Sequence, residues 1–121
     1  MKVCIITSTR ADFGLLKNLI FKLKKNKSFV LKIIASGTHF SKKYGYTYNE
    51  IKENKIEINK KIKCNFNSDK PKGISKVMSK CIVETSKIFR ILRPDLVIVL
   101  GDRYEILSSS LDIAPQLFPN D

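Results

Sequence analysis

Short apolar runs alternate along this chain with segments of helical periodicity, and this alternation restricts the fold more than any other feature. Residues 3–7, 30–35 and 96–100 are rich in β-branched and other apolar side chains, and each run ends in a polar turn. Continuous runs of this kind are typical of strands buried on both faces. Because parallel strands need crossovers, which are usually helices, the order predicts an α/β fold with a Rossmann-like parallel sheet and helices on both faces.

The segments between these runs predict the helices and a weaker strand. Asp12 is a suitable helix cap, and residues 74–92 carry the strongest helical signal, with Pro94 just beyond it. Residues 41–53 predict a loop and a short helix, and residues 65–73 a connecting loop. Two further sets of apolar residues predict the sheet-facing side of the first helix and a weak third strand: Leu15, Leu16, Leu19, Ile20 and Leu23 for the helix, and Ile56, Ile58 and Ile62 for the strand.

The formal net charge of +12 raises the question of a nucleic-acid partner. The charge comes from 19 lysines and only four arginines, which are scattered along the chain. No aromatic residues are interleaved with a basic stripe, as single-strand binders use for stacking. We therefore expect no nucleic-acid partner, although the charge would help to attract an anionic small molecule.

The spacing of the cysteines and the hydropathy of the chain argue against a metal-binding, a membrane-spanning and a secreted protein. Cys4, Cys64 and Cys81 are too far apart for a paired-cysteine metal site, and Cys4 and Cys81 fall in apolar patterns typical of core residues. No metal is expected. No apolar run approaches the ~18 residues of a membrane span, and the start of the chain is unlike a secretory signal. These features predict a cytoplasmic protein without a membrane partner.

The turns after the predicted strands carry the candidate site residues, because ligands of parallel α/β sheets bind at the carboxyl ends of the strands. Arg10 in the first turn is either an anion-binding group or a surface arginine. His39, the single histidine, is either structural or a contact and acid–base group for a ligand. Asp102 is either an orienting or proton-transfer acid or a helix cap, with Arg103 beside it. Glu105 lies near the ligand or favours the first helical turn.

The first turn excludes two common nucleotide sites. It lacks the GxGxxG pattern of dinucleotide-binding proteins and the GKS/T ending of a phosphate-binding loop. Neither an NAD nor an ATP site is supported, and no cofactor is expected.

Taken in order, the three turns resemble one family. They read I-T-S-T-R-A-D-F-G-L-L at residues 6–16, A-S-G-T-H-F-S at 35–41 and I-V-L-G-D-R-Y-E at 98–105. This ordered set is similar to the hydrolysing UDP-N-acetylglucosamine 2-epimerases, which include sialic-acid and legionaminic-acid pathway enzymes. The resemblance covers about residues 2–110.

The resemblance implies a GT-B-type fold, in which two Rossmann-like domains enclose a UDP-amino sugar. It implies release of UDP by elimination through a glycal-like intermediate, followed by addition of water with inversion at C2, without metal or NAD. By the same resemblance, Arg10 would bind substrate, His39 would line the sugar pocket and Asp102 would be a catalytic or orienting carboxylate. Arg103 and Glu105 belong to the same signature.

The chain departs from the family pattern near its end. Residues 1–110 are expected to form the N-terminal Rossmann-like domain, incomplete, while residues 111–121 form an atypical tail containing Pro115 and Pro119. The acidic segment and the C-terminal nucleotide-binding domain of the family are absent from the sequence. We therefore expect an inactive fragment of the epimerase. The alternative is a non-catalytic binding or self-associating Rossmann-like module, which would pair, for example as a homo-oligomer, through an exposed sheet edge or apolar face.

Overall fold

The elements of the fold follow the predicted strand–helix order. The structure, a computed structural model, describes residues 1–40, 47–62, 71–101 and 104–112, and only the backbone of Thr38, Phe40, Tyr104 and Glu105. A single 3₁₀ turn covers Gly37–Phe40. The other elements are β1 (Lys2–Thr7), α1 (Arg10–Lys25), β2 (Val30–Ala35), α2 (Tyr48–Glu53), β3 (Lys60–Lys61), α3 (Pro71–Leu92), β4 (Leu96–Val99) and α4 (Tyr104–Leu111).

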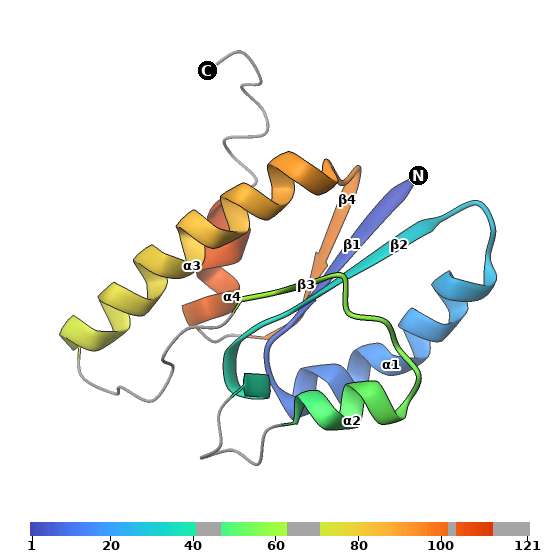
Figure 1. Cartoon of the computed structure of the whole chain (residues 1–121), viewed down its shortest axis with the longest axis horizontal. Coiled ribbons are helices and arrows are strands. Elements are labelled where there is room, and N and C mark those ends of the chain that lie inside the picture. The colour runs from blue at the N-terminus through green and yellow to red at the C-terminus, as the bar shows by residue number, and fades with distance from the viewer. Residues whose placement is uncertain (41–46, 63–70, 102–103, 113–121) are drawn as a thin grey trace.

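The four strands form one parallel sheet in the order β3-β2-β1-β4. Thr7 of β1 pairs with Ala35 of β2, and Ile6 pairs with Val99 of β4. The carboxyl ends of three strands therefore reach the same edge of the sheet. The helices cover both faces, with α1 and α2 on one side and α3 and α4 on the other (Figure 1). The predicted Rossmann-like parallel sheet is confirmed.

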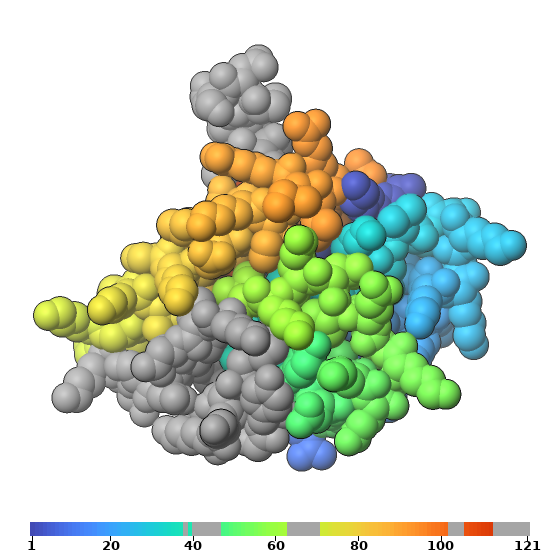
Figure 2. All heavy atoms as spheres, viewed as in Figure 1, coloured from blue at the N-terminus to red at the C-terminus, as the bar shows by residue number. Residues whose placement is uncertain are grey.

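Two apolar clusters hold the helices against the sheet, because alternate residues of β1 point to opposite faces. Val3 and Ile5 pack towards α1 and α2, whereas Cys4 and Ile6 pack towards α3 and α4. Phe89 of α3 is fully buried, and the hydroxyls of Thr85 and Ser109 join α3 to α4 at 3.1 Å. In Figure 2, α3 and the segment around α2 and β3 lie side by side on the viewed face. The predicted burial of Cys4 and Cys81 is confirmed, while Cys64 lies outside the described residues.

The start and inner face of α1 differ from the prediction. Thr9, not Asp12, is the N-cap, and Asp12 is the third helical residue of a capping box. The buried stripe of the helix runs through Phe13, Leu16 and Ile20, so Leu15 is 74% exposed. The predicted leucine face was wrong at Leu15 and Leu19, because packing against the sheet turns the side with Phe13, Leu16 and Ile20 inward.

The outer strands are also shorter than predicted. The third strand is only two residues long. The side-chain oxygen of Asn59 accepts the backbone N–H of Ile33 in β2 at 2.8 Å, in place of a hydrogen bond from the backbone of a longer strand. Ile56 and Ile62 are still buried. Among the described residues β4 pairs only with β1 and so forms an edge of the sheet. Val97 and Val99 pack on one face and Ile98 on the other, while Leu96 at the start of the strand is 46% exposed. The helix α3 begins at Pro71, inside the predicted loop, while residues 63–70 lie outside the described part.

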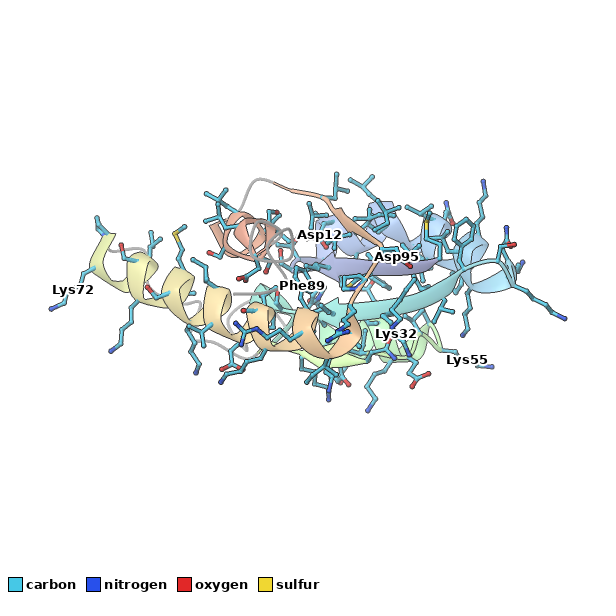
Figure 3. All side chains as sticks on the ribbon, turned by 90° about the horizontal axis from the view of Figure 1, so that it is seen from above. Asp12, Lys32, Lys55, Lys72, Phe89 and Asp95 are labelled. Carbon is cyan, nitrogen blue, oxygen red and sulfur yellow. The ribbon has the colours of Figure 1, made fainter. Side chains whose placement is uncertain are left out.

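Charged side chains lie at both ends of the molecule. Lys55 and Lys72 reach outward at opposite ends of the molecule, whereas Asp12 lies within its body (Figure 3). No described helix combines the length and the apolar character that crossing a bilayer requires.

Candidate functional site at the strand ends

The candidate site is the strand-end rim, which consists of residues 7–10 after β1, 36–39 after β2 and 100–101 after β4. The backbone N–H of Ser36 donates to the carbonyl of Thr7 at 2.9 Å, which joins the first two turns. Gly101 adopts a φ of +120°, a conformation that L side chains rarely take, and so allows the predicted sharp turn after β4. The Ser36 hydroxyl is buried at this rim without a partner among the described residues.

Asp12 organises the first turn of the rim. Its Oδ2 accepts the backbone N–H of Thr9 at 2.9 Å and that of Ser8 at 3.1 Å, and it also accepts the Ser8 hydroxyl at 3.1 Å. Its Oδ1 accepts a short hydrogen bond from the Thr7 hydroxyl. In return, the Thr9 hydroxyl accepts the Asp12 backbone N–H at 3.2 Å. The turn that leads into α1 is therefore held by a buried carboxylate rather than by solvent.

His39 is fully buried, and both of its ring nitrogens meet threonine hydroxyls. Nε2 lies 2.9 Å from the Thr7 oxygen, and Nδ1 lies 2.7 Å from the Thr47 oxygen. The ring also packs edge-on against Phe13, with centroids 6.3 Å apart. Burial lowers the pKa of His39 to about 4, against the opposing attraction of Asp12 and Glu50. The imidazole is therefore neutral at pH 7.

Arg10 opens α1 and is largely exposed. Its Nε lies 3.1 Å from Oε2 of Glu50 in α2, and the two side chains are 74% and 40% exposed. An exposed pair of this kind contributes only about 0.2–1 kcal/mol, so an anionic ligand could displace Glu50 at little cost. The N-terminus of α1 adds the positive end of the helix dipole beside the guanidinium.

The structure describes two of the five predicted site residues in full. Arg10 and His39 both lie at the strand-end rim, where Thr7 and Asp12 connect their turns. Asp102 and Arg103 lie outside the described residues, and for Glu105 only the backbone, in the first turn of α4, is described. The roles assigned to all five residues stay predictions.

Sequence patterns do not mark three polar residues of this network as parts of a site. Thr7 fits the end of a strand, and Asp12 fits a helix cap. The T-x-x-D spacing from Thr9 to Asp12 is a capping-box pattern and could have placed the cap correctly. No sequence signal identifies Thr47, which is brought to His39 only by the tertiary fold.

No group of three or more metal-ligating side chains occurs within the described ranges. The groups that a ligand can reach at the rim are the exposed guanidinium of Arg10 and the N-terminus of α1, and the buried Asp12 and His39 lie behind them. This set suits an anionic ligand.

Comparison with known sequences finds relatives among the 2-epimerases of nucleotide sugars. A family model described as UDP-N-acetylglucosamine 2-epimerase matches residues 21–114. A GDP/UDP-N,N'-diacetylbacillosamine 2-epimerase (hydrolyzing) from Campylobacter jejuni is 43% identical over 107 residues, covering 88% of this chain and 28% of that protein. A UDP-N,N'-diacetylbacillosamine 2-epimerase (hydrolyzing) from Legionella pneumophila is 30% identical, covering 91% and 29%. The chain thus spans less than a third of the length of these relatives.

Comparison with solved structures supports the fold. The UDP-GlcNAc 2-epimerase of Neisseria meningitidis bound to UDP-GlcNAc superposes with a TM-score of 0.78 at 20% identity, over 97% of this chain and 30% of that one. The enzyme of Methanocaldococcus jannaschii in complex with UDP-GlcNAc and UDP gives 0.76 at 24% identity, over 97% and 30%. The fold is thus the N-terminal Rossmann-like part of a GT-B-type architecture, and the chain belongs to the UDP-N-acetylglucosamine 2-epimerase family.

Proposed function

We propose that this chain supplies the sugar-side half of a hydrolysing 2-epimerase that acts on a UDP-linked N-acetyl amino sugar for sialic- or legionaminic-type acid and surface polysaccharide synthesis. The observation that carries the proposal is the strand-end rim, where Arg10 and His39 follow the neighbouring strands β1 and β2, and where the turn after β4 leads in the sequence to Asp102. Hydrolysing relatives at 43% and 30% identity support the reaction class.

A diacetamido sugar is the substrate that we favour. The relative at 43% identity is named for diacetylbacillosamine, whereas the UDP-N-acetylglucosamine 2-epimerase of Neisseria meningitidis serogroup B is 32% identical over a similar span. Substrate preference within the family would then follow the nearer relative.

In the proposed reaction, the proton at C2 leaves, the bond from C1 to the UDP oxygen breaks, and a glycal forms. Water then adds across the double bond, giving the free sugar with C2 inverted. Asp102 would exchange or orient the C2 proton, with Arg103 and Glu105 near the substrate. Arg10 would leave Glu50 and pair with the anionic part of the nucleotide. His39, a buried neutral imidazole with both ring nitrogens bonded to threonines, would shape the sugar pocket from behind its lining.

The rim provides part of the substrate's contacts. The resemblance implies that family members enclose the nucleotide between two domains. This chain covers 28% of the length of the Campylobacter jejuni relative. We therefore expect little or no turnover from residues 1–121 alone, because the reacting groups and the UDP would not be held together.

A graft enzyme tests the proposal. In this graft enzyme, residues 1–110 replace the matching N-terminal segment of the Campylobacter jejuni relative. We expect UDP release from UDP-N,N'-diacetylbacillosamine, with inverted C2 in the free sugar by NMR, and slower release from UDP-N-acetylglucosamine. The unmodified relative and residues 1–121 alone are the positive and negative controls. A folded graft enzyme that binds UDP but releases none from either sugar would overturn the proposal.

Self-association is the second candidate function, because four leucines near the open edge of the described sheet are exposed. Leu96 begins β4 and Leu100 follows it, and Leu107 and Leu111 lie on α4, with exposed fractions of 37–54%. An uncovered edge and apolar surface favour pairing with another chain. Sedimentation equilibrium of residues 1–121 should then show a dimer that dissociates on Leu107→Glu substitution. A monomer at high concentration would exclude this role.

A further inference from the structure

Four side chains from different parts of the chain form one continuous hydrogen-bonded series. It runs from Asp12 through Thr7 and His39 to Thr47. Asp12 is 5% exposed, and Thr7 and His39 are fully buried. Since Asp12, Thr7 and His39 are buried and Thr47 is half-buried, the direction of the hydrogen bonds from Asp12 to His39 is set by the chemistry of their protein neighbours.

The direction can be assigned from the Asp12 end. The described partners of its two oxygens are all donors: the N–H groups of Ser8 and Thr9 and the hydroxyls of Ser8 and Thr7. A carboxylate in such a cradle only accepts. The Thr7 hydroxyl therefore donates its single proton in the hydrogen bond to Asp12. Its oxygen then acts as the acceptor for His39.

The assignment then passes through the imidazole. Nε2 faces the Thr7 oxygen at 2.9 Å and must carry the ring proton. A neutral imidazole has one N–H, so Nδ1 presents a lone pair and accepts the Thr47 hydroxyl at 2.7 Å. One carboxylate thus determines the proton position on a ring that it does not touch.

We propose that Asp12 is a positioning residue, which fixes His39 as the Nε2–H tautomer through Thr7 and holds the turn that presents Arg10. The catalytic consequence rests on the proposed function, whereas the tautomer is a property of the folded chain. One buried carboxylate would then determine two features of the rim. It would fix which ring nitrogen of His39 carries the proton, and it would hold the backbone just before Arg10.

Asp12→Asn should reverse the series. The cradle around Oδ2 contains the N–H of Thr9 and two donors of Ser8, so the amide oxygen takes that place. The amide nitrogen then faces Thr7 and donates to its oxygen. The Thr7 hydroxyl is released to donate to Nε2, and the ring proton moves to Nδ1, where the Thr47 oxygen accepts it.

NMR of the ¹⁵N-labelled chain reads the tautomer directly, because His39 is the only histidine. Long-range ¹H–¹⁵N correlations at pH 7 should show a protonated Nε2 and an unprotonated Nδ1 in the unmodified chain. In Asp12→Asn the pattern should invert. Asp95→Asn, at the opposite end of the sheet, is the matched control and should leave the pattern unchanged. A protonated Nδ1 in the unmodified chain, or a retained Nε2–H in Asp12→Asn, would overturn the proposal.

If Asp12→Asn does not fold, Thr7→Val removes the relay hydroxyl while keeping the shape of the side chain. The preference for Nε2–H should then be lost, and a chain that keeps it fully would contradict the proposal. In the graft enzyme, Asp12→Asn should lower kcat at least tenfold with a smaller change in KM. Inverted tautomers with unchanged kcat would refute the positioning role, whereas inactivity of the unsubstituted graft enzyme would refute the proposed function alone.

Discussion

His39 should make the stability of this chain depend on pH between 5 and 7. Its pKa falls from an ordinary 6.5 to about 4 on folding because the ring is buried. As the pH falls, the unfolded chain takes up this proton before the folded chain does. The stability that the neutral ring contributes is therefore present above pH 6.5 and is lost as the pH falls towards 4.

The size of the effect follows from the two pKa values. Between pH 7 and pH 5 the shift corresponds to a loss of about 2 kcal/mol in the free energy of unfolding. Asp112 acts in the opposite direction, because burial raises its pKa from 3.8 to about 6. Its contribution is present at low pH and is lost as the pH rises through 6. The Asp112→Asn background removes this opposing contribution.

Urea unfolding of Asp112→Asn at pH 7 and pH 5 measures the His39 contribution. The double variant Asp112→Asn, His39→Gln is the control, since it lacks the only histidine. We expect the single variant to lose about 2 kcal/mol more than the double variant over this interval. Equal losses in the two variants would show that His39 is not held neutral by burial, and the reasoning would fail.

Three further predictions concern the first turn, the cysteines and the exposed ion pair. Thr9→Ala should lower the free energy of unfolding by about 1 kcal/mol, and Thr9→Ser should largely restore it, because the hydroxyl caps α1; an unaffected Thr9→Ala would contradict the capping box. In the Cys64→Ser variant, Ellman's reagent should leave Cys4 and Cys81 unreacted until urea is added. Both cysteines are at most 1% exposed, and burial raises the pKa of Cys4 to about 12. Rapid reaction in the native state would show that the core is open. Glu50→Gln should change the free energy of unfolding by less than about 1 kcal/mol, with the difference vanishing in salt. A larger loss would give the pair with Arg10 a structural role.

The sheet could be predicted from sequence because its signals are local. The run at residues 30–35 matches β2 in full, and the periodicity of residues 74–92 gives most of α3. The face of α1 could not be predicted as well, because Leu15 and Leu16 satisfy a helical pattern equally and only packing selects Leu16. The length of β3 depends on the Asn59 side chain replacing a strand hydrogen bond, a tertiary event without a sequence pattern.

The candidate site was predictable only in part for the same reason. The strand-end rule placed Arg10 and His39 at one edge of the sheet, because parallel strands bring their carboxyl ends together. The burial of His39 and its bonds to Thr7 and Thr47 depend on residues 8 and 32 positions away along the chain. The sequence is compatible with a structural His39 and with a His39 that belongs to a site. The structure shows a buried ring bonded to two threonines, and a role in a site stays a prediction.

The proposed function places the nucleotide sugar at the carboxyl ends of the strands and not at their amino ends. The most direct test compares two carboxylates that flank β4 in the sequence of the graft enzyme. Asp102 follows the carboxyl end of β4, whereas Asp95 lies at the amino end and accepts the Lys2 backbone N–H at 2.7 Å. Measured as the rate of UDP release, Asp102→Asn should lower kcat by about 100-fold or more, as expected for loss of an acid–base group, and Asp95→Asn should stay within about twofold. Equal rates for the two variants would contradict the claim.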